Sequence, residues 1–115
     1  MGSDPDTTLE RICALALALP EAHEELTWGE VTLRVRRKIF AFPGRGHTLT
    51  IKADPDELPA LLGDPRFGPA PYLARGGWVA MDLAGAAIDW DEIGELIKTS
   101  YCLIAPRALA REVGG

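Results

Sequence analysis

The sequence contains few of the residues that build metal centres and disulfide frameworks. It has two cysteines and two histidines in 115 residues, and no CxxC pair. Zinc sites need closely spaced Cys and His ligands, and a single disulfide adds little to a domain with an ordinary core. Cys13 and Cys102 both fall on predicted apolar helix faces. We therefore expect reduced, buried thiols in a cytoplasmic protein, with no metal and no cofactor.

Long apolar runs and catalytic signatures are also missing. The most apolar segment, ICALALALP, is about half of the ~20 residues that cross a bilayer, and it lacks the basic flank of a secretory signal. There is no GxGxxG, P-loop, HExxH or GxSxG motif. Ser100 lies inside a predicted helix and is interpreted as a polar-face or small packing residue, while His23 is interpreted as a solvated loop residue. The sequence predicts neither a membrane span nor an enzyme.

Positive charge is scarce, but it is concentrated in one place. Twelve Lys and Arg stand against 17 Asp and Glu, for a formal net charge of −5. This balance excludes a protein that coats nucleic acid with its whole surface, because phosphate contacts need positive charge. The segment LRVRRKIFAF nevertheless carries four basic residues, namely Arg34, Arg36, Arg37 and Lys38.

The sequence predicts three helices, each opened by a capping box. The boxes pair Thr7 with Glu10, Asp54 with Glu57, and Asp89 with Glu92. Pro20 and Pro106 end the first and the last helix, because proline disfavours helix in the residue before it. The segment RALAREVGG after Pro106 is expected to be a frayed tail.

Between the first and last helices, an apolar period of two predicts strands at 31–35, 38–42, 48–53 and 78–83, with one more in the Gly/Pro-rich segment before the last. The polar segment 21–30 is expected to be a connection. Strands joined by short turns run antiparallel. The predicted fold is therefore an α+β, two-layer domain at residues 7–107, with an antiparallel sheet of about five strands, terminal helices packed on one face, and tails at 1–6 and 108–115.

The basic segment is predicted to be a hairpin that turns at Arg36-Arg37. In that register Val35 lies opposite Lys38, Leu33 opposite Phe40, and Val31 opposite Phe42, so the five apolar residues share one face. A two-residue turn needs positive φ at both positions, which arginine disfavours. Either the loop is longer, or the two arginines are strained.

Two candidate sites follow from these predictions. The first is the basic hairpin, where Arg34, Arg36, Arg37 and Lys38 either contact DNA phosphates or only keep the edge soluble. Four contacts would give a log–log salt slope of order −3 to −4. The second is a surface of lysine and large aromatics that would suit a small anionic ligand, a base or a protein, unless the aromatics only rim the core. Its residues are Trp28, Lys52, Tyr72 and Trp78.

Several segments together resemble the MmcQ/YjbR-like family of small bacterial proteins. They are LALP, TWGEVTLRVRRKIFAF, LTIKADPDEL, PAPYLARGGWVAMDL and ELIKTSYCLIAP, in that order. The resemblance implies a CyaY-like (frataxin-like) fold, and a DNA-binding role by analogy with double-wing folds. The family's recurring positions map to Trp28, Lys38, Lys52, Asp54-Pro55, Trp78 and Tyr101.

The chain departs from the family pattern at two positions, and it lacks one surface that is associated with frataxins. Gly77 stands where many relatives have a polar residue or histidine, and Arg36-Arg37 replaces the Gly or Asp of many first hairpin turns. The acidic iron-binding surface of frataxins has no counterpart, since the first predicted helix carries only Glu10. We expect a monomeric DNA-binding protein, with a small-ligand or protein-binding module as the alternative.

Overall fold

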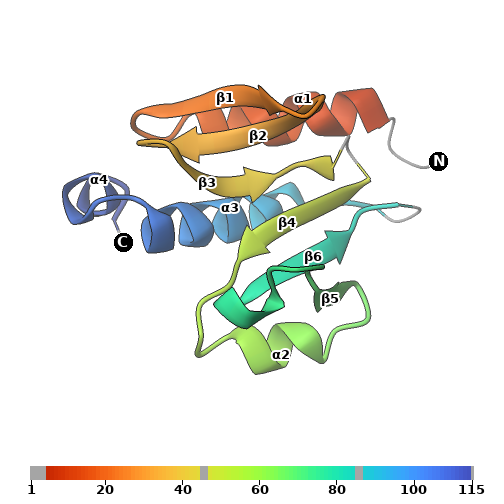
Figure 1. Ribbon diagram of the computed structural model, residues 1–115. Coiled ribbons are helices and arrows are strands. Elements are labelled where there is room, and N and C mark those ends of the chain that lie inside the picture. The colour runs from red at the N-terminus through yellow and green to blue at the C-terminus, as the bar shows by residue number, and fades with distance from the viewer. Residues whose placement is uncertain (1–4, 45–46, 85–86, 115) are drawn as a thin grey trace.

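The computed structural model describes residues 5–44, 47–84 and 87–114. The elements are, in order, α1 (Pro5–Leu17), β1 (Ala22–Thr27), β2 (Glu30–Val35), β3 (Lys38–Phe42), β4 (Thr48–Lys52), α2 (Leu58–Leu62), β5 (Phe67–Pro69), a 3₁₀ helix (Ala74–Gly76), β6 (Trp78–Asp82), α3 (Trp90–Ile104) and α4 (Arg107–Glu112). The six strands form one antiparallel sheet in the order β1-β2-β3-β4-β6-β5. Helices α1 and α3 lie behind this sheet, and α2 lies beside β5 (Figure 1). The predicted α+β architecture is confirmed.

The sheet has one strand more than expected, because the segment predicted to be a connection forms β1. All six residues of β1 pair with β2, from Ala22 opposite Val35 to Thr27 opposite Glu30. In the described sheet β1 is an edge strand, and its central residues Glu24 and Glu25 are exposed. Charged residues are common on edge strands, where they discourage aggregation. Because β1 carries such residues, its sequence lacks the apolar alternation from which a strand is predicted.

The β2–β3 hairpin confirms the predicted turn but not the whole predicted register. Arg36 and Arg37 form a two-residue turn with φ of 50° and 74°, and Val35 lies opposite Lys38. The register then shifts, because Leu33 lies opposite Ala41 and not opposite Phe40.

The shift is a β-bulge, in which Phe40 is the extra residue. Phe40 and Ala41 are both fully buried, and Phe42 pairs with Thr50 of β4. Alternation along β4 puts Thr50 on the face opposite the buried Ile51. Phe42 therefore points away from the helices, so the prediction that it shares the core face with Leu33 is wrong.

Two of the predicted helix starts also differ. Helix α1 begins at Pro5, which is well suited to the first turn, so Thr7 is inside the helix and does not cap it. It ends at Leu17, before Pro20. Helix α2 begins at Leu58, because the carboxylate of Asp54 accepts a hydrogen bond from the Asp56 amide and holds a turn instead.

The predicted start of α3 is confirmed at its cap. The Asp89 carboxylate accepts hydrogen bonds from the amides of Asp91 and Glu92. The Glu92 side chain does not complete the box, since it binds the Arg66 guanidinium at 2.7 and 3.0 Å. Arg66 also binds Asp64, and this hydrogen bond lowers the pKa of the Asp64 carboxyl. The cluster ties the loop before β5 to the start of α3.

The segment expected to be a frayed tail forms α4. Leu109 is only 8% exposed and belongs to the core. The Cys102 thiol donates a long hydrogen bond of 3.9 Å to the Ala110 carbonyl. On α3, Tyr101 packs edge-on against Phe40, with ring centroids 5.3 Å apart and planes at 89°. Its hydroxyl donates to the Pro20 carbonyl at 2.6 Å. The helical layer is thus fixed to the middle of the sheet. Helices α1 and α3 pack on one face only, and we call the other face, where the described segment 70–77 lies near Phe42 and Trp78, the open face.

Candidate functional site

The open face of the sheet carries a polar and aromatic set of side chains. Leu49 and Ile51 of β4 are fully buried beneath the helices, so alternation places Thr50 and Lys52 on the other face. The register across β3, β4 and β6 then gives the open-face set: Ile39, Phe42, Thr50, Lys52, Trp78 and Ala80. Two of the predicted pocket residues, Lys52 and Trp78, lie on this face.

Lys52 and Trp78 are cross-strand partners on this face. The indole of Trp78 packs against Phe42, with ring centroids 5.8 Å apart at an angle of 65°. Gly76 lies close to the edge of the indole, since a Cβ there would come within 3.2 Å of the Trp78 Cδ1 atom. Trp78 is therefore half-buried and fixed in place, between Phe42 and the loop that precedes β6.

A hollow of about 260 Å³ lies beside Lys52, where β4 ends. We call it the cationic hollow, and its lining residues are Lys52, Ala53, Pro55, Leu58, Ala74, Arg75, Gly76 and Gly77. Two cations line it and no carboxylate does. Among the described residues, no ion pair within 4.0 Å involves Lys52 or Arg75. Both cations thus remain available to an anion from solution.

Ser100 connects Lys52 to the helical layer. Its fully buried hydroxyl accepts a hydrogen bond from the Lys52 amide at 2.9 Å and donates one to the Phe40 carbonyl at 2.6 Å. The β3–β4 ladder pairs Ala41 with Ile51, so Phe40 and Lys52 would form the next pair. The hydroxyl stands between them and joins β3, β4 and α3, so it does not belong to a polar helix face.

The basic hairpin is partly neutralised by carboxylates of the chain itself. Arg34 is the least exposed of its cations, with 19% of its side chain accessible, and its Nε lies 2.9 Å from a carboxylate oxygen of Glu25. Arg36 binds both carboxylate oxygens of Glu21, and this hydrogen bond lowers the pKa of the Glu21 carboxyl. Two of the four predicted phosphate contacts are therefore already engaged.

The other two cations of the hairpin are exposed. Arg37 at the turn and Lys38 at the start of β3 make no ion pair with any described carboxylate. The partners of Arg34 and Arg36 come from β1 and the residue before it, the segment that the sequence predicted to be a loop. Sequence reasoning therefore had no signal for this neutralisation.

Trp28 and Tyr72 are not rim residues of the core. The two residues are 98% and 104% exposed, and their φ angles of 55° and 66° are in the left-handed region. A second hollow of about 220 Å³ lies on the open face, and neither Trp28 nor Tyr72 is among its lining residues, which are Glu30, Phe42, Gly44, Thr48, Thr50, Ala70, Pro71 and Leu73. Of the four predicted pocket residues, the structure therefore brings together only Lys52 and Trp78, while Trp28 and Tyr72 lie in two separate exposed turns.

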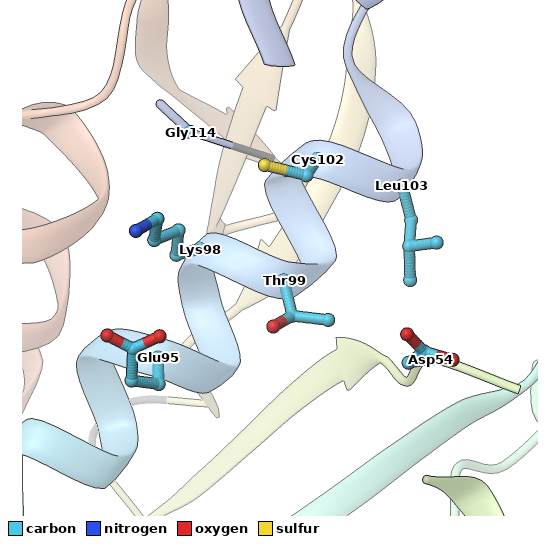
Figure 2. Close-up of a pocket in the computed structure, with 7 residues that line it drawn as sticks. All are labelled: Asp54, Glu95, Lys98, Thr99, Cys102, Leu103 and Gly114. Atoms are coloured by element: carbon cyan, nitrogen blue, oxygen red, sulfur yellow. The ribbon is translucent and has the colours of Figure 1, made fainter. Parts of the chain in front are cut away.

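A larger hollow of about 370 Å³ lies on α3 and was not predicted (Figure 2). Glu95, Lys98, Thr99, Cys102 and Leu103 of α3 line it, together with Asp54 and Gly114. Burial raises the pKa of the Cys102 thiol, and the opposing effect of Lys98 is smaller. Burial likewise raises the pKa of the Cys13 thiol. Both shifts disfavour the thiolate, which is the nucleophilic form of cysteine.

Residues 5–44, 47–84 and 87–114 contain neither a metal-ligand cluster nor a membrane-spanning helix. There, no three side chains of His, Cys, Asp or Glu come together as metal ligands. In the same ranges, no helix is long and apolar enough to cross a bilayer.

Comparison with known proteins gives the chain a family. The family model described as YjbR matches residues 17–103. A solved structure, Deinococcus radiodurans protein DR2400 with a DUF419 domain, is similar at a TM-score of 0.74 and 21% sequence identity, over 96% of this chain and 91% of that one. No curated protein matches. At that identity the structural likeness supports the fold, and the family match extends over most of the chain, which therefore belongs to the YjbR family.

Proposed function

We propose that the protein is a non-enzymatic binding module that takes an anionic, phosphate-like group in the cationic hollow. The observation that carries the proposal is that Lys52 and Arg75 line the same hollow with no carboxylate lining it. Two cations held near each other repel, and this repulsion is relieved when an anion binds between them. A guanidinium and an ammonium also supply the donors that phosphate oxygens need.

The surroundings of the two cations favour a ligand with an aromatic part. Trp78 lies directly across from Lys52, and its ring packs against Phe42 on the same face. Lys52 projects from a strand whose backbone is held by Ser100, so its starting point is rigid. An anion bound at Lys52 would therefore have a fixed aromatic surface beside it.

An NMR titration with inorganic pyrophosphate tests this function. We expect amide shifts at Lys52 and at the loop residues Arg75, Gly76 and Gly77 of the cationic hollow. Lys52→Ala and Arg75→Ala should each weaken binding about fivefold, the change that corresponds to about 1 kcal/mol for one charge-assisted contact on a solvated surface. The backbone fold should be unchanged, because Arg75 is exposed and Lys52 forms no ion pair with a described residue.

Lys98→Ala is the matched control, because it removes the same charge from the hollow on α3. It should leave pyrophosphate affinity unchanged. Shifts that map to α3, or a loss in Lys98→Ala equal to that in Lys52→Ala, would assign anion binding to nonspecific charge and overturn the proposal.

DNA binding through the basic hairpin is a second candidate, supported by the exposed pair Arg37 and Lys38. Because Arg34 and Arg36 are engaged by Glu25 and Glu21, two phosphate contacts are expected in place of four. At about −0.9 per phosphate, the log–log salt slope should be about −2.

Fluorescence anisotropy with labelled duplex DNA tests the hairpin. Glu21→Gln should raise the affinity severalfold, because it releases Arg36 to contact a further phosphate. Arg37→Gly should lower the affinity, and glycine suits the φ of 74° at this position, so the loss cannot be ascribed to unfolding. Indifference of the affinity to both changes would rule out the hairpin as the contact.

A further inference from the structure

The cationic hollow has an apolar wall as well as its two cations. Apart from the cations and two glycines, the residues that line it are aliphatic, namely Ala53, Pro55, Leu58 and Ala74. We propose that the ligand of the cationic hollow is a small organic phosphate, in which the phosphate group is esterified to an apolar body of a few carbons. This inference rests on the proposed function, because it takes Lys52 and Arg75 as the site of the phosphate group.

The wall offers no hydrogen-bonding side chain to the body of a ligand. Among the described residues that line the hollow, none carries a hydroxyl, an amide or a carboxylate, and the side-chain donors belong to Lys52 and Arg75. A hydroxyl placed against such a wall loses its hydration without a replacement, whereas an apolar group gains by leaving water. Trp78 and Phe42 are not lining residues, so an aromatic part of the ligand lies outside the hollow.

The apolar wall is built before any ligand binds. It consists of two segments, 52–58 from the end of β4 to the start of α2, and 74–77 before β6. The Ala53 amide donates a hydrogen bond to the Gly77 carbonyl at 2.9 Å and so ties the two segments together. Ala53 is only 3% exposed, and Leu58 packs against the core. Binding therefore needs no ordering of the wall, which lowers its entropic cost.

The size of the hollow limits the apolar body. Its volume of about 260 Å³ is slightly below the roughly 300–1,000 Å³ of pockets that hold drug-sized ligands. The phosphate group fills part of this space and leaves room for a few carbons. The acyl chains of a membrane lipid are longer than that, so the ligand is a free small molecule.

The other two hollows do not combine these properties. The carboxylates of Asp54 and Glu95 line the hollow on α3 (Figure 2), and the carboxylate of Glu30 lines the hollow beside Phe42. A carboxylate repels a phosphate group and offers hydrogen-bond acceptors to a polar ligand. Of these three hollows, the cationic hollow alone pairs unopposed cations with an aliphatic wall.

An NMR titration with methyl phosphate and butyl phosphate tests the inference. The two probes have the same phosphate group and differ by three methylenes. Complete burial of one methylene corresponds to about fourfold in affinity, and we expect about twofold in a hollow that is open to solvent. Butyl phosphate should therefore bind about eightfold tighter than methyl phosphate. Glycerol 3-phosphate, which is of similar size but carries two hydroxyls, should bind no tighter than methyl phosphate.

Substitutions in the wall test where the butyl group lies. Leu58→Ser should reduce the eightfold preference to about twofold and leave the affinity for methyl phosphate unchanged. Leu62→Ser is the matched control, because Leu62 is a 43% exposed leucine of the same helix that does not line the hollow. Pro55→Ser, at an exposed position, should lower the preference as well, and it keeps the test decisive if Leu58→Ser disturbs the core.

The results separate this inference from the proposed function. If pyrophosphate binds at Lys52 and Arg75, but butyl phosphate binds no tighter than methyl phosphate or glycerol 3-phosphate, the apolar body is wrong and the anion site stands. Loss of the preference in Leu62→Ser to the same extent as in Leu58→Ser would also overturn the inference. If pyrophosphate does not bind in the cationic hollow, the proposed function fails, and this inference fails with it.

Discussion

Replacing Phe40 by alanine is expected to lower the free energy of unfolding by about 4 kcal/mol. Phe40 is fully buried at the centre of the sheet and packs edge-on against Tyr101 of α3. Truncating a buried phenylalanine costs about 3–5 kcal/mol, through lost transfer energy and the cavity that remains. Loss of the aromatic pair adds to this cost. Denaturant unfolding followed by circular dichroism measures the change.

Phe42→Ala is the matched control, because it removes the same group from the same strand. Phe42 is on the open face and only half-buried, so we expect at most about half the loss seen for Phe40→Ala. The comparison also tests the bulge. The regular register predicted from the sequence puts both rings in the core, so equal losses would favour that register over the one in which Phe40 is the extra residue.

The sequence predicts this hairpin correctly only near its turn. Val35 and Lys38 are opposite each other, as the turn at Arg36-Arg37 requires. Farther along, the segment KIFAF has apolar residues on both faces, so its alternation is compatible with either register. The bulge is chosen by the packing of Phe40 against a helix some 60 residues later in the chain, and no local pattern carries that information.

The predicted fold class is correct because most of its evidence is local. The alternation of β4 and β6 and the cap of α3 at Asp89 depend on near neighbours in sequence, and the structure has each of them. The missed elements, β1 and α4, are a polar edge strand and a short terminal helix. Each is stabilised by pairing or packing against another element, so neither has a strong pattern of its own.

For the candidate site, too, the sequence indicates features that depend on near neighbours and misses contacts between distant segments. The alternation of β4 indicates that Lys52 points to the face of the sheet away from the buried side chain of Ile51, and the structure agrees. It could not bring Arg75 to Lys52, because a Gly/Pro-rich loop has no period from which its path can be read. For the same reason, the pairing of Arg36 with Glu21 could not be foreseen, since it follows from the unpredicted strand β1.

Ser100→Ala is expected to lower the free energy of unfolding by about 3 kcal/mol, although it removes a single oxygen atom. The hydroxyl is the partner of both the Lys52 amide and the Phe40 carbonyl. Without it, two buried backbone groups lose their hydrogen bonds, and each unsatisfied group costs about 1–3 kcal/mol. Denaturant unfolding measures the loss, and faster hydrogen exchange of the Lys52 amide should accompany it.

Thr99→Ala is the control that separates this bridge from the helix itself. Thr99 precedes Ser100 on α3 and lines the hollow in Figure 2, without a hydrogen bond from its side chain to any described residue. Alanine favours helix over both serine and threonine, so propensity alone predicts that each change is mildly stabilising. A large loss in Ser100→Ala beside a small change in Thr99→Ala therefore isolates the bridge. Equal effects would mean that β3 and β4 close into a direct ladder without the serine, and that the position of Lys52 does not depend on α3.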